Sequence, residues 1–326
     1  MEAGLLLVLL LILGAEFVNG WTDSPNAIAT VVGTRSLTPL QAVGMAAVFN
    51  LLGVLSGTKV AATIGKGIVD ASVIDLTTVG GAMVSIIIWS SVAALWGIPT
   101  SETHALVAGL AGAALATAGP GALVWDGWRK VLLGLAFSTI LGGFGGLLLM
   151  TLVYWLFRNR VPAQSRTTFR VLQIFSSAFM AFSHGSNDGQ KFMGVFTLAL
   201  VIGGILPQFA IPLWVIFLCA AVMALGTLTG GWRIIRTMGM KITRLETHQG
   251  FAAEVAAATT IEIATRFGIP LSTTHTITSS IVGVGATRGG SFVNWGVTRQ
   301  LVTAWFFTFP ICGGISYLVV RVLRSL

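Results

Sequence analysis

"WGIPTSETH" at residues 96–104 returns, with few changes, as "FGIPLSTTH" at residues 267–275. Both copies place a proline and a run of polar side chains just before a histidine, inside long apolar surroundings. Two weaker matches follow the same order along the chain: "TIGKG" (63–67) with "TMGMK" (237–241), and "GWTDSPN" (20–26) with "GSNDGQK" (185–191). Three matches in one order indicate an internal duplication, which predicts two structural repeats.

The repeats are expected to cover residues 1–157 and 171–326, joined by a basic linker at 158–170. Within each repeat, glycine, proline and polar clusters interrupt the apolar segments at matching positions. Paired, interrupted hydrophobic segments are typical of the substrate site of a secondary transporter. An odd number of membrane crossings per repeat would make the two repeats inverted, and an even number would make them parallel.

The composition excludes an ordinary soluble protein. Of the 326 residues, 55% are hydrophobic and only 9% are charged, whereas a soluble domain carries about 25% charged residues. Several apolar runs approach the roughly 20 residues that cross a bilayer as a helix. We therefore expect an all-α polytopic membrane protein.

The net charge of +8 comes largely from two short basic stretches, "RNRVPAQSRTTFR" (158–170) and "RIIRTMGMKITR" (233–244). Basic loops between apolar spans are typical of the cytoplasmic side of a membrane protein. Neither stretch resembles a nucleic-acid-binding module, so no nucleic-acid partner is expected. The pattern predicts helices near residues 3–19, 26–34, 40–58, 78–97, 102–118, 130–157, 169–185, 189–204, 210–231, 249–267, 273–287 and 296–323.

Two polar clusters interrupt the apolar pattern at corresponding places. The first, "NGWTDSPNAIAT" (19–30), contains Asp23, which could act in transport or simply cap the helix that Pro25 opens. The second, "SHGSNDGQK" (183–191), holds more polar side chains than one helix cap requires: His184, Ser186, Asn187, Asp188, Gln190 and Lys191. Carboxylate and amide oxygens at a broken helix suit a small hard cation. Lys191 offers a positive charge to an anion or a partner to Asp188.

The duplicated motif itself predicts two helix starts. Pro99 and Pro270 should end one helix each, and hydroxyl side chains should open the next: Ser101, Thr103, Ser272 and Thr274. A helix N-terminus offers free backbone N–H groups and a positive dipole end, so it binds anions. Two such starts aimed at one point would form a cradle for an oxyanion, although each alone could be ordinary capping.

Four further side chains are candidates. His104 and His275 fall just inside these helices and could orient the site or relay protons. No second His or Cys lies near either at ligand spacing, so no transition-metal site is expected. Glu102 gives the first copy a carboxylate that Thr273 replaces in the second, and Glu254 lies on the apolar run 249–267.

Five ordered motifs resemble the inorganic phosphate transporter (PiT) family, most closely its short prokaryotic members: "NGWTDSPNAIATVVGTR", "SHGSNDGQKFMG", "GGWRIIRTMGMKIT", "QGFAAEVAAA" and "GIPLSTTHTITSSIVGVG". The resemblance covers nearly the whole chain. It implies two inverted repeats with broken or re-entrant helices, and symport of inorganic phosphate with H⁺ or Na⁺ into the cell across the cytoplasmic membrane. It also implies no enzyme activity and no cofactor.

The same resemblance assigns residues. Coupling-cation roles fall on Asp23, Asn26, Asn187, Asp188 and Glu254, to which the polar cluster adds Gln190. Substrate binding falls on Ser101, Thr103, Ser272, Thr273 and Thr274, to which the charge argument adds Lys191. The expected partners are phosphate, a cation and the lipid bilayer. The sequence leaves open whether the protein forms a homo-oligomer.

Departures from the family pattern keep alternatives open. Many bacterial relatives have His where Thr22 stands, and Ser where Glu102 stands. The coupling ion, H⁺ or Na⁺, is therefore not fixed, and sulfate or another tetrahedral oxyanion is an alternative substrate. Two remoter alternatives are an intramembrane hydrolase, built on Ser101 and His104, and an anion channel.

Overall fold

The chain folds into helices joined by turns and short loops over residues 3–159 and 162–326, the part that the computed structural model describes. Apolar segments in a bilayer satisfy their backbone hydrogen bonds most simply as helices. The helices are α1 (Ala3–Gly33), α2 (Pro39–Val54), α3 (Lys59–Gly67), α4 (Leu76–Trp96), α5 (Glu102–Ala118), α6 (Trp125–Phe157), α7 (Pro162–His184), α8 (Gln190–Ile202), α9 (Leu213–Thr229), α10 (Trp232–Arg236), α11 (Thr247–Arg266), α12 (Thr273–Ala286) and α13 (Trp295–Leu323). Two π-helical turns, Gly185–Gly189 and Thr237–Lys241, extend α7 and α10.

Four of the described helices are long and apolar enough to cross a membrane on their own: α1, α4, α6 and α13. Two bent pairs are each apolar enough to make one more span. The α2–α3 pair bends by 70°, and α9 bends by 62° against Trp232–Lys241. The prediction of an all-α polytopic membrane protein is confirmed at this level.

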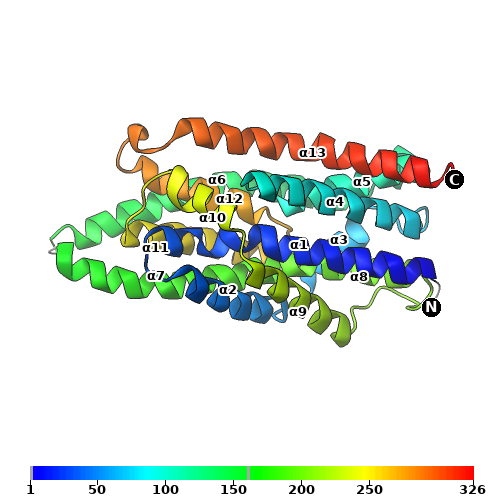
Figure 1. The fold of residues 1–326 in the computed structure, drawn as a ribbon, viewed down its shortest axis with the longest axis horizontal. Coiled ribbons are helices and arrows are strands. Elements are labelled where there is room, and N and C mark those ends of the chain that lie inside the picture. Colours follow the sequence, from blue (N-terminus) through cyan, green and yellow to red (C-terminus); the bar gives the residue numbers. More distant parts are fainter. Residues whose placement is uncertain (1–2, 160–161) are drawn as a thin grey trace.

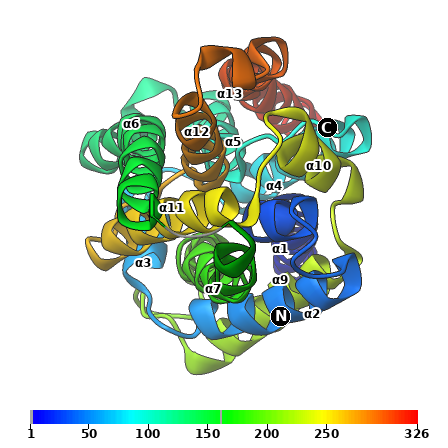
Figure 2. The same ribbon diagram turned by 90° about the vertical axis from the view of Figure 1, so that its left-hand side faces the viewer.

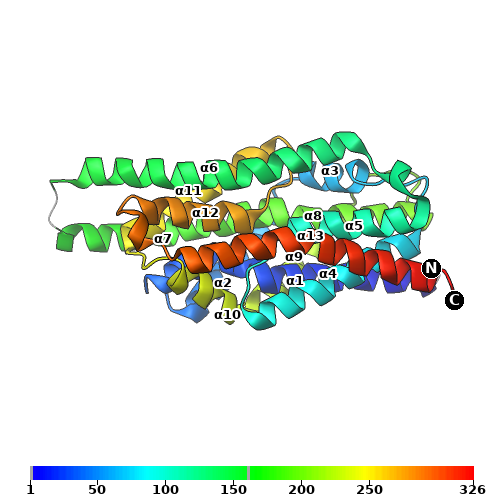
Figure 3. The same cartoon turned by 90° about the horizontal axis from the view of Figure 1, so that it is seen from above.

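The helices lie along one long axis, with the start of α1 and the end of α13 at one end of the molecule, and the end of α6 and the start of α7 at the other (Figure 1). Seen along this axis, α1 lies inside the bundle, between α4, α7 and α9 (Figure 2). Helices α5 and α12 begin near the middle and run toward opposite ends (Figure 3). The two copies of the duplicated motif therefore start their helices deep inside the protein.

The predicted break at residues 19–26 is wrong, because α1 runs unbroken from Ala3 to Gly33 with Pro25 inside it. A proline in a helix frees the carbonyl four residues earlier, here that of Trp21. The Ser24 hydroxyl donates to that oxygen at 3.4 Å, one way in which membrane helices tolerate proline. Asp23 is therefore not a helix cap, and its carboxylate is free for other contacts.

The second predicted break, near residue 185, is also not a break, since α7 continues through the Gly185–Gly189 π turn into α8. π turns of this kind occur often at functional sites. By contrast, the predicted helix starts at Glu102 and Thr273 are confirmed.

Small residues let the central helices approach closely. A Cβ atom on Gly20 of α1 would lie 2.3 Å from the Met223 carbonyl oxygen of α9. A Cβ atom on Gly226 of α9 would lie 2.2 Å from the Phe17 carbonyl oxygen of α1. Such contacts are typical of packed membrane helices, and they hold α1 close against α9.

Candidate functional site

Helix α1 contributes Asp23 and Asn26, three residues apart and so on one face of the helix. Both side chains are buried. The Asn26 amide nitrogen donates to the hydroxyls of Thr273 at 3.2 Å and Thr274 at 3.0 Å. Asn26 thus ties α1 to the first turn of α12.

The π turn contributes Asp188, which is fully buried. One carboxylate oxygen lies 2.5 Å from the ammonium of Lys191, and the other accepts a hydrogen bond from the Thr273 hydroxyl at 3.0 Å. The Lys191 ammonium also donates to the Thr103 hydroxyl at 2.6 Å and to the Leu271 carbonyl at 2.9 Å. One fully buried lysine therefore contacts both copies of the duplicated motif.

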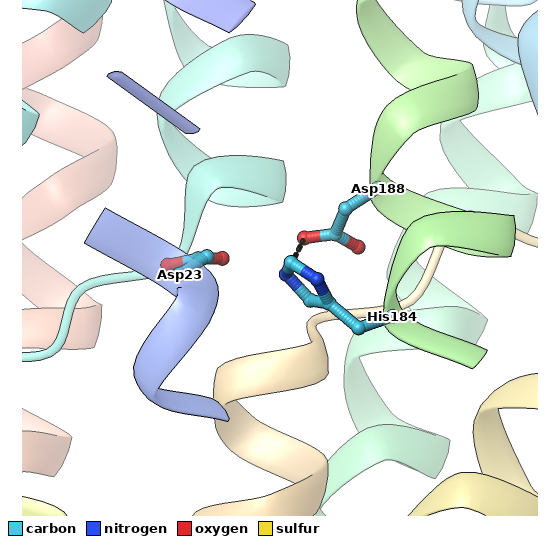
Figure 4. Close-up of side chains that lie close together, drawn as sticks. All are labelled: Asp23, His184 and Asp188. Carbon is cyan, nitrogen blue, oxygen red and sulfur yellow. Dashed lines mark ion pairs between the residues drawn. The ribbon is translucent and has the colours of Figure 1, made fainter. Parts of the chain in front are cut away.

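Asp23, His184 and Asp188 face one another across this junction (Figure 4). Each offers one oxygen or nitrogen atom, and these atoms all lie within 4.8 Å of one another. His184 Nδ1 lies 3.0 Å from the Asn50 side-chain oxygen, so a neutral imidazole carries its proton on Nδ1. Its Nε2 is then a free acceptor, 3.7 Å from Asp188. Two carboxylates and an imidazole nitrogen can bind a cation here.

The two helix starts are linked reciprocally. The Thr103 hydroxyl donates to the carbonyl of Leu271 at 2.5 Å, and the Thr274 hydroxyl donates to the carbonyl of Thr100 at 2.9 Å. Thr103 and Thr274 hold the same place in the two motifs, as do Thr100 and Leu271. The two copies therefore bond to each other in the same way, with their first turns side by side.

Both N-cap serines act as the sequence predicts. Ser101 Oγ accepts from the backbone N–H of His104 at 3.3 Å, and Ser272 Oγ accepts from that of His275 at 3.2 Å. The two histidine rings lie with their centroids 4.4 Å apart. Further N–H groups of each first turn have no partner within their own helix. The arrangement can hold an anion between two positive helix ends.

Glu102 lies on the α1 side of this junction. One of its carboxylate oxygens accepts a hydrogen bond from the Thr22 hydroxyl at 3.1 Å, and the other has no hydrogen-bond partner among the described residues. One Asp23 carboxylate oxygen and the Asn26 amide oxygen also have no hydrogen-bond partner among the described residues. These buried oxygens are available to a cation or a proton.

Asn187 and Gln190 stand beside this group and bond elsewhere. The Asn187 amide holds the segment before α12, accepting from Leu271 N–H at 3.1 Å and donating to the Ile269 carbonyl at 3.2 Å. The Gln190 side-chain oxygen accepts from Val60 N–H at 2.9 Å, at the start of α3. Both fix the backbone around the site.

Glu254 lies in a separate buried cluster. Its carboxylate accepts hydrogen bonds from the hydroxyls of Thr30 and Ser176, and from the Gln173 amide at 3.4 Å. These partners come from α1 and α7, so Glu254 joins α11 to both helices. The structure does not bring Glu254 together with Asp23 and Asp188.

Sequence reasoning gave no role to Glu16, Thr22 or Asn50, all of which are buried. A signal for Glu16 was present, because polar residues recur at helical spacing along α1: Glu16, Asn19, Asp23, Asn26 and Thr30. The expected break at residues 19–26 hid this spacing. Asn50 is marked only by its place in an apolar run.

The family model for the "Phosphate transporter family" matches residues 19–316 of the chain. A "Probable low-affinity inorganic phosphate transporter" of Rhizobium meliloti (strain 1021) is 45% identical over 305 residues, covering 93% of this chain and 91% of the relative. A protein of Bacillus subtilis (strain 168) with the same name is 39% identical over 324 residues, covering 98% of this chain and 97% of the relative.

A solved structure, "The sodium-dependent phosphate transporter", superposes with a TM-score of 0.91 at 25% sequence identity, covering 100% of both chains. The helices described above therefore adopt a fold already seen in a transporter.

Proposed function

This chain belongs to the phosphate transporter family, and from that premise we propose that it carries inorganic phosphate across a membrane by symport with a cation, H⁺ or Na⁺. Na⁺ is included because the solved relative is described as sodium-dependent. The family is one of transporters, and this chain is not an enzyme. In line with this, Ser101 Oγ accepts from the backbone of His104 instead of contacting its ring as a nucleophile would.

The observation that carries the proposal is the meeting of two helix starts with one lysine and two aspartates inside an apolar bundle. Phosphate would lie at the first turns of α5 and α12, where hydroxyls and backbone N–H groups can donate to its oxygens. The candidate donors are Ser101, Thr103, Ser272, Thr273, Thr274 and Lys191. His104 and His275 would orient these turns.

The coupling cation would bind beside the phosphate, at Asp23 and Asp188. A divalent anion is costly in an apolar environment unless positive charge enters with it. Asn26 bonds to the hydroxyls of Thr273 and Thr274, so it would link occupancy of the two sites. Asn187 and Gln190 would hold the surrounding backbone. Glu254 would hold a cation in its own oxygen cluster with Thr30 and Ser176.

We further propose that residues 1–157 and 171–326 form two inverted repeats. Helix α1 runs from the end that holds the termini, whereas α7 and α8 run in the opposite direction (Figure 1). Each half also has one bent pair, with angles of 70° and 62°. The reciprocal bonds of Thr103 and Thr274 are what a twofold relation would produce.

For the membrane and the orientation, we propose the cytoplasmic membrane, with the basic linker 158–170 on the cytoplasmic side. The end of α6 and the start of α7 lie at one end of the molecule, and α10, which carries two arginines, lies in the half nearer that end (Figure 1). With this orientation both basic stretches lie on the cytoplasmic side, where the loops of membrane proteins carry an excess of Lys and Arg.

The decisive experiment is uptake of labelled phosphate into proteoliposomes, with a Na⁺ gradient and a pH gradient imposed separately. Uphill accumulation driven by either gradient is expected, and the effective gradient names the coupling ion. Accumulation of sulfate in place of phosphate would overturn the assignment of phosphate as the substrate. Phosphate flux that only follows its own gradient would indicate a channel.

A further inference from the structure

Glu16 is a fully buried carboxylate in the first half of α1. One of its oxygens accepts a hydrogen bond from the Asn19 amide at 3.3 Å, and the other has no hydrogen-bond partner among the described residues. Within residues 3–159 and 162–326, no lysine or arginine forms an ion pair with it. An ionised carboxylate in such surroundings would be strongly disfavoured.

Charge balance across the membrane interior points in the same direction. The buried carboxyl groups of the described chain are those of Glu16, Asp23, Glu102, Asp188 and Glu254, whereas Lys191 is the buried member among its lysines and arginines. Lys191 pairs with Asp188, and Glu254 has three hydrogen-bond donors. Glu16 has one neutral donor at a long distance. Like Asp23 and Glu102, each of which also has a carboxylate oxygen without a partner among the described residues, Glu16 lacks a compensating positive charge.

Glu16 lies on the same face of α1 as the candidate cation site. Residues 16 and 23 are two helical turns apart, so the two carboxyl groups are separated by about 10 Å along the helix axis. Charged or titratable groups on the other elements that act electrostatically on Glu16 include Asp188 in the π turn, Lys191 on α8, Glu102 on α5 and the Cys219 thiol on α9. Helix α4, which also packs on α1, has no charged residue.

We propose that Glu16 is a proton-binding carboxylate of the transport cycle, taking up one proton with each phosphate and releasing it on the opposite side. This inference rests on the proposed phosphate symport. An O–H bond to the carboxylate forms on loading and breaks on release, and the proton goes to water on the receiving side. A metal cation does not fit, since hard cations need about six oxygen ligands and, among the described residues, Glu16 has one hydrogen-bond partner, Asn19.

Coupling follows from electrostatics alone. Phosphate at the starts of α5 and α12 would bring negative charge close to Glu16 in surroundings of low dielectric constant. That charge favours the neutral, protonated form of Glu16. By linkage, protonation of Glu16 favours phosphate binding by the same factor. Proton and phosphate would therefore load together and leave together.

The test uses Glu16→Gln, which keeps the size of the side chain and stays neutral, with the exposed Asp126→Asn as the matched control. Purified wild-type and variant proteins are reconstituted, and three quantities are measured: phosphate exchange at equal concentrations, accumulation driven by a pH gradient, and protons carried per phosphate. Glu16→Gln should keep the exchange but lose the accumulation, with the proton ratio falling by about one. The control should match the wild type.

Two outcomes would overturn the proposal: a Glu16→Gln variant that keeps the wild-type proton ratio, or a wild-type protein whose uptake ignores the pH gradient. Should Glu16→Gln fail to fold, Glu16→Asp takes its place and should keep coupling with a displaced pH profile; an unchanged profile would count against Glu16. Infrared titration of the protonated-carboxyl band, without phosphate, compares the wild type with either variant. It stays decisive if the wild type carries no phosphate, so the two proposals can fail separately.

Discussion

The His104 and His275 rings, which hold the same position in the two copies of the duplicated motif, contact each other with centroids 4.4 Å apart and planes at 84°. His275 also stacks on the Trp305 ring at 3.8 Å, and His104 Nδ1 lies 3.3 Å from the Trp305 carbonyl. Trp305 of α13 thus supports both histidines. This packing favours an orienting role for the pair over a proton relay.

Replacing His275 tests that role. Because Phe can keep the stacking on Trp305, His275→Phe should retain uptake and cost less than about 1.5 kcal/mol of stability. His275→Ala removes a buried ring and should cost about 3 kcal/mol. Thermal unfolding and phosphate uptake are measured on the same preparations. Loss of uptake in a well-folded His275→Phe variant would instead favour the relay.

Asp188 and Lys191 form a buried ion pair at 2.5 Å. Removing either charge alone should therefore destabilise the protein. Lys191→Met leaves the Asp188 charge without its partner and should cost about 3–5 kcal/mol. Asp188→Asn should abolish uptake in a folded protein. The double variant should recover stability relative to Lys191→Met but stay inactive, because in the proposed mechanism Asp188 binds the cation and Lys191 binds the phosphate.

The control for this series is Asp126→Asn, whose pair with Arg129 is exposed. An exposed pair contributes at most about 1 kcal/mol, so its removal should change neither unfolding nor uptake. Normal uptake by Asp188→Asn would show that the coupling cation does not use Asp188.

Much of the fold could be predicted, because apolar length and helix starts are local properties. The starts of α5 and α12 follow directly from Pro99 and Pro270 with the hydroxyls after them. The continuity of α1 could not be predicted in this way. Proline and a polar cluster favour a break, and only the bundle around α1 and the Ser24 hydroxyl stabilise the helix there.

For the site, the residue types indicated that a cation and an anion could be bound, but not which side chains bond to each other. The aspartates of the two polar clusters, Asp23 and Asp188, lie close together. The sequence does not show that Gln190 turns toward the start of α3, or that Glu254 bonds to Thr30 and Ser176. Such contacts depend on helix rotation across long separations, which local patterns do not specify.

Thr273 connects the two proposed sites, since its hydroxyl donates to Asp188 at 3.0 Å and accepts from Asn26 at 3.2 Å. Thr273→Val keeps the shape but removes a hydrogen bond to a charged group, about 1.5–3 kcal/mol. The phosphate concentration for half-maximal uptake should rise about 10- to 100-fold. Thr260→Val, which loses only a bond to the Ala256 carbonyl in its own helix, serves as the control. Equal effects of both substitutions would contradict the link.

Glu254 tests whether the second oxygen cluster takes part in coupling. Glu254→Gln removes the charge and keeps the size, so the cation-to-phosphate ratio should fall if Glu254 holds a cation. Asp126→Asn is the comparison, since Asp126 is exposed and pairs only with the exposed Arg129 among the described residues. The ratio is measured from initial uptake rates of labelled cation and phosphate. An unchanged ratio with a lower unfolding temperature would make Glu254 a link between α1, α7 and α11 only.

Close packing between α6 and α12 holds the second helix start in place. A Cβ atom on Gly142 would lie 2.4 Å from the Thr276 carbonyl oxygen, in the first turns of α12. Gly142→Ala should therefore push α12 away, lowering the unfolding temperature and weakening phosphate binding together. Gly44→Ala on α2 is the matched control, because nothing lies within 4 Å of its added methyl group. There the alanine should stabilise the helix by about 0.5–1 kcal/mol. If Gly142→Ala is as stable and as active as Gly44→Ala, the position of α12 does not depend on this contact.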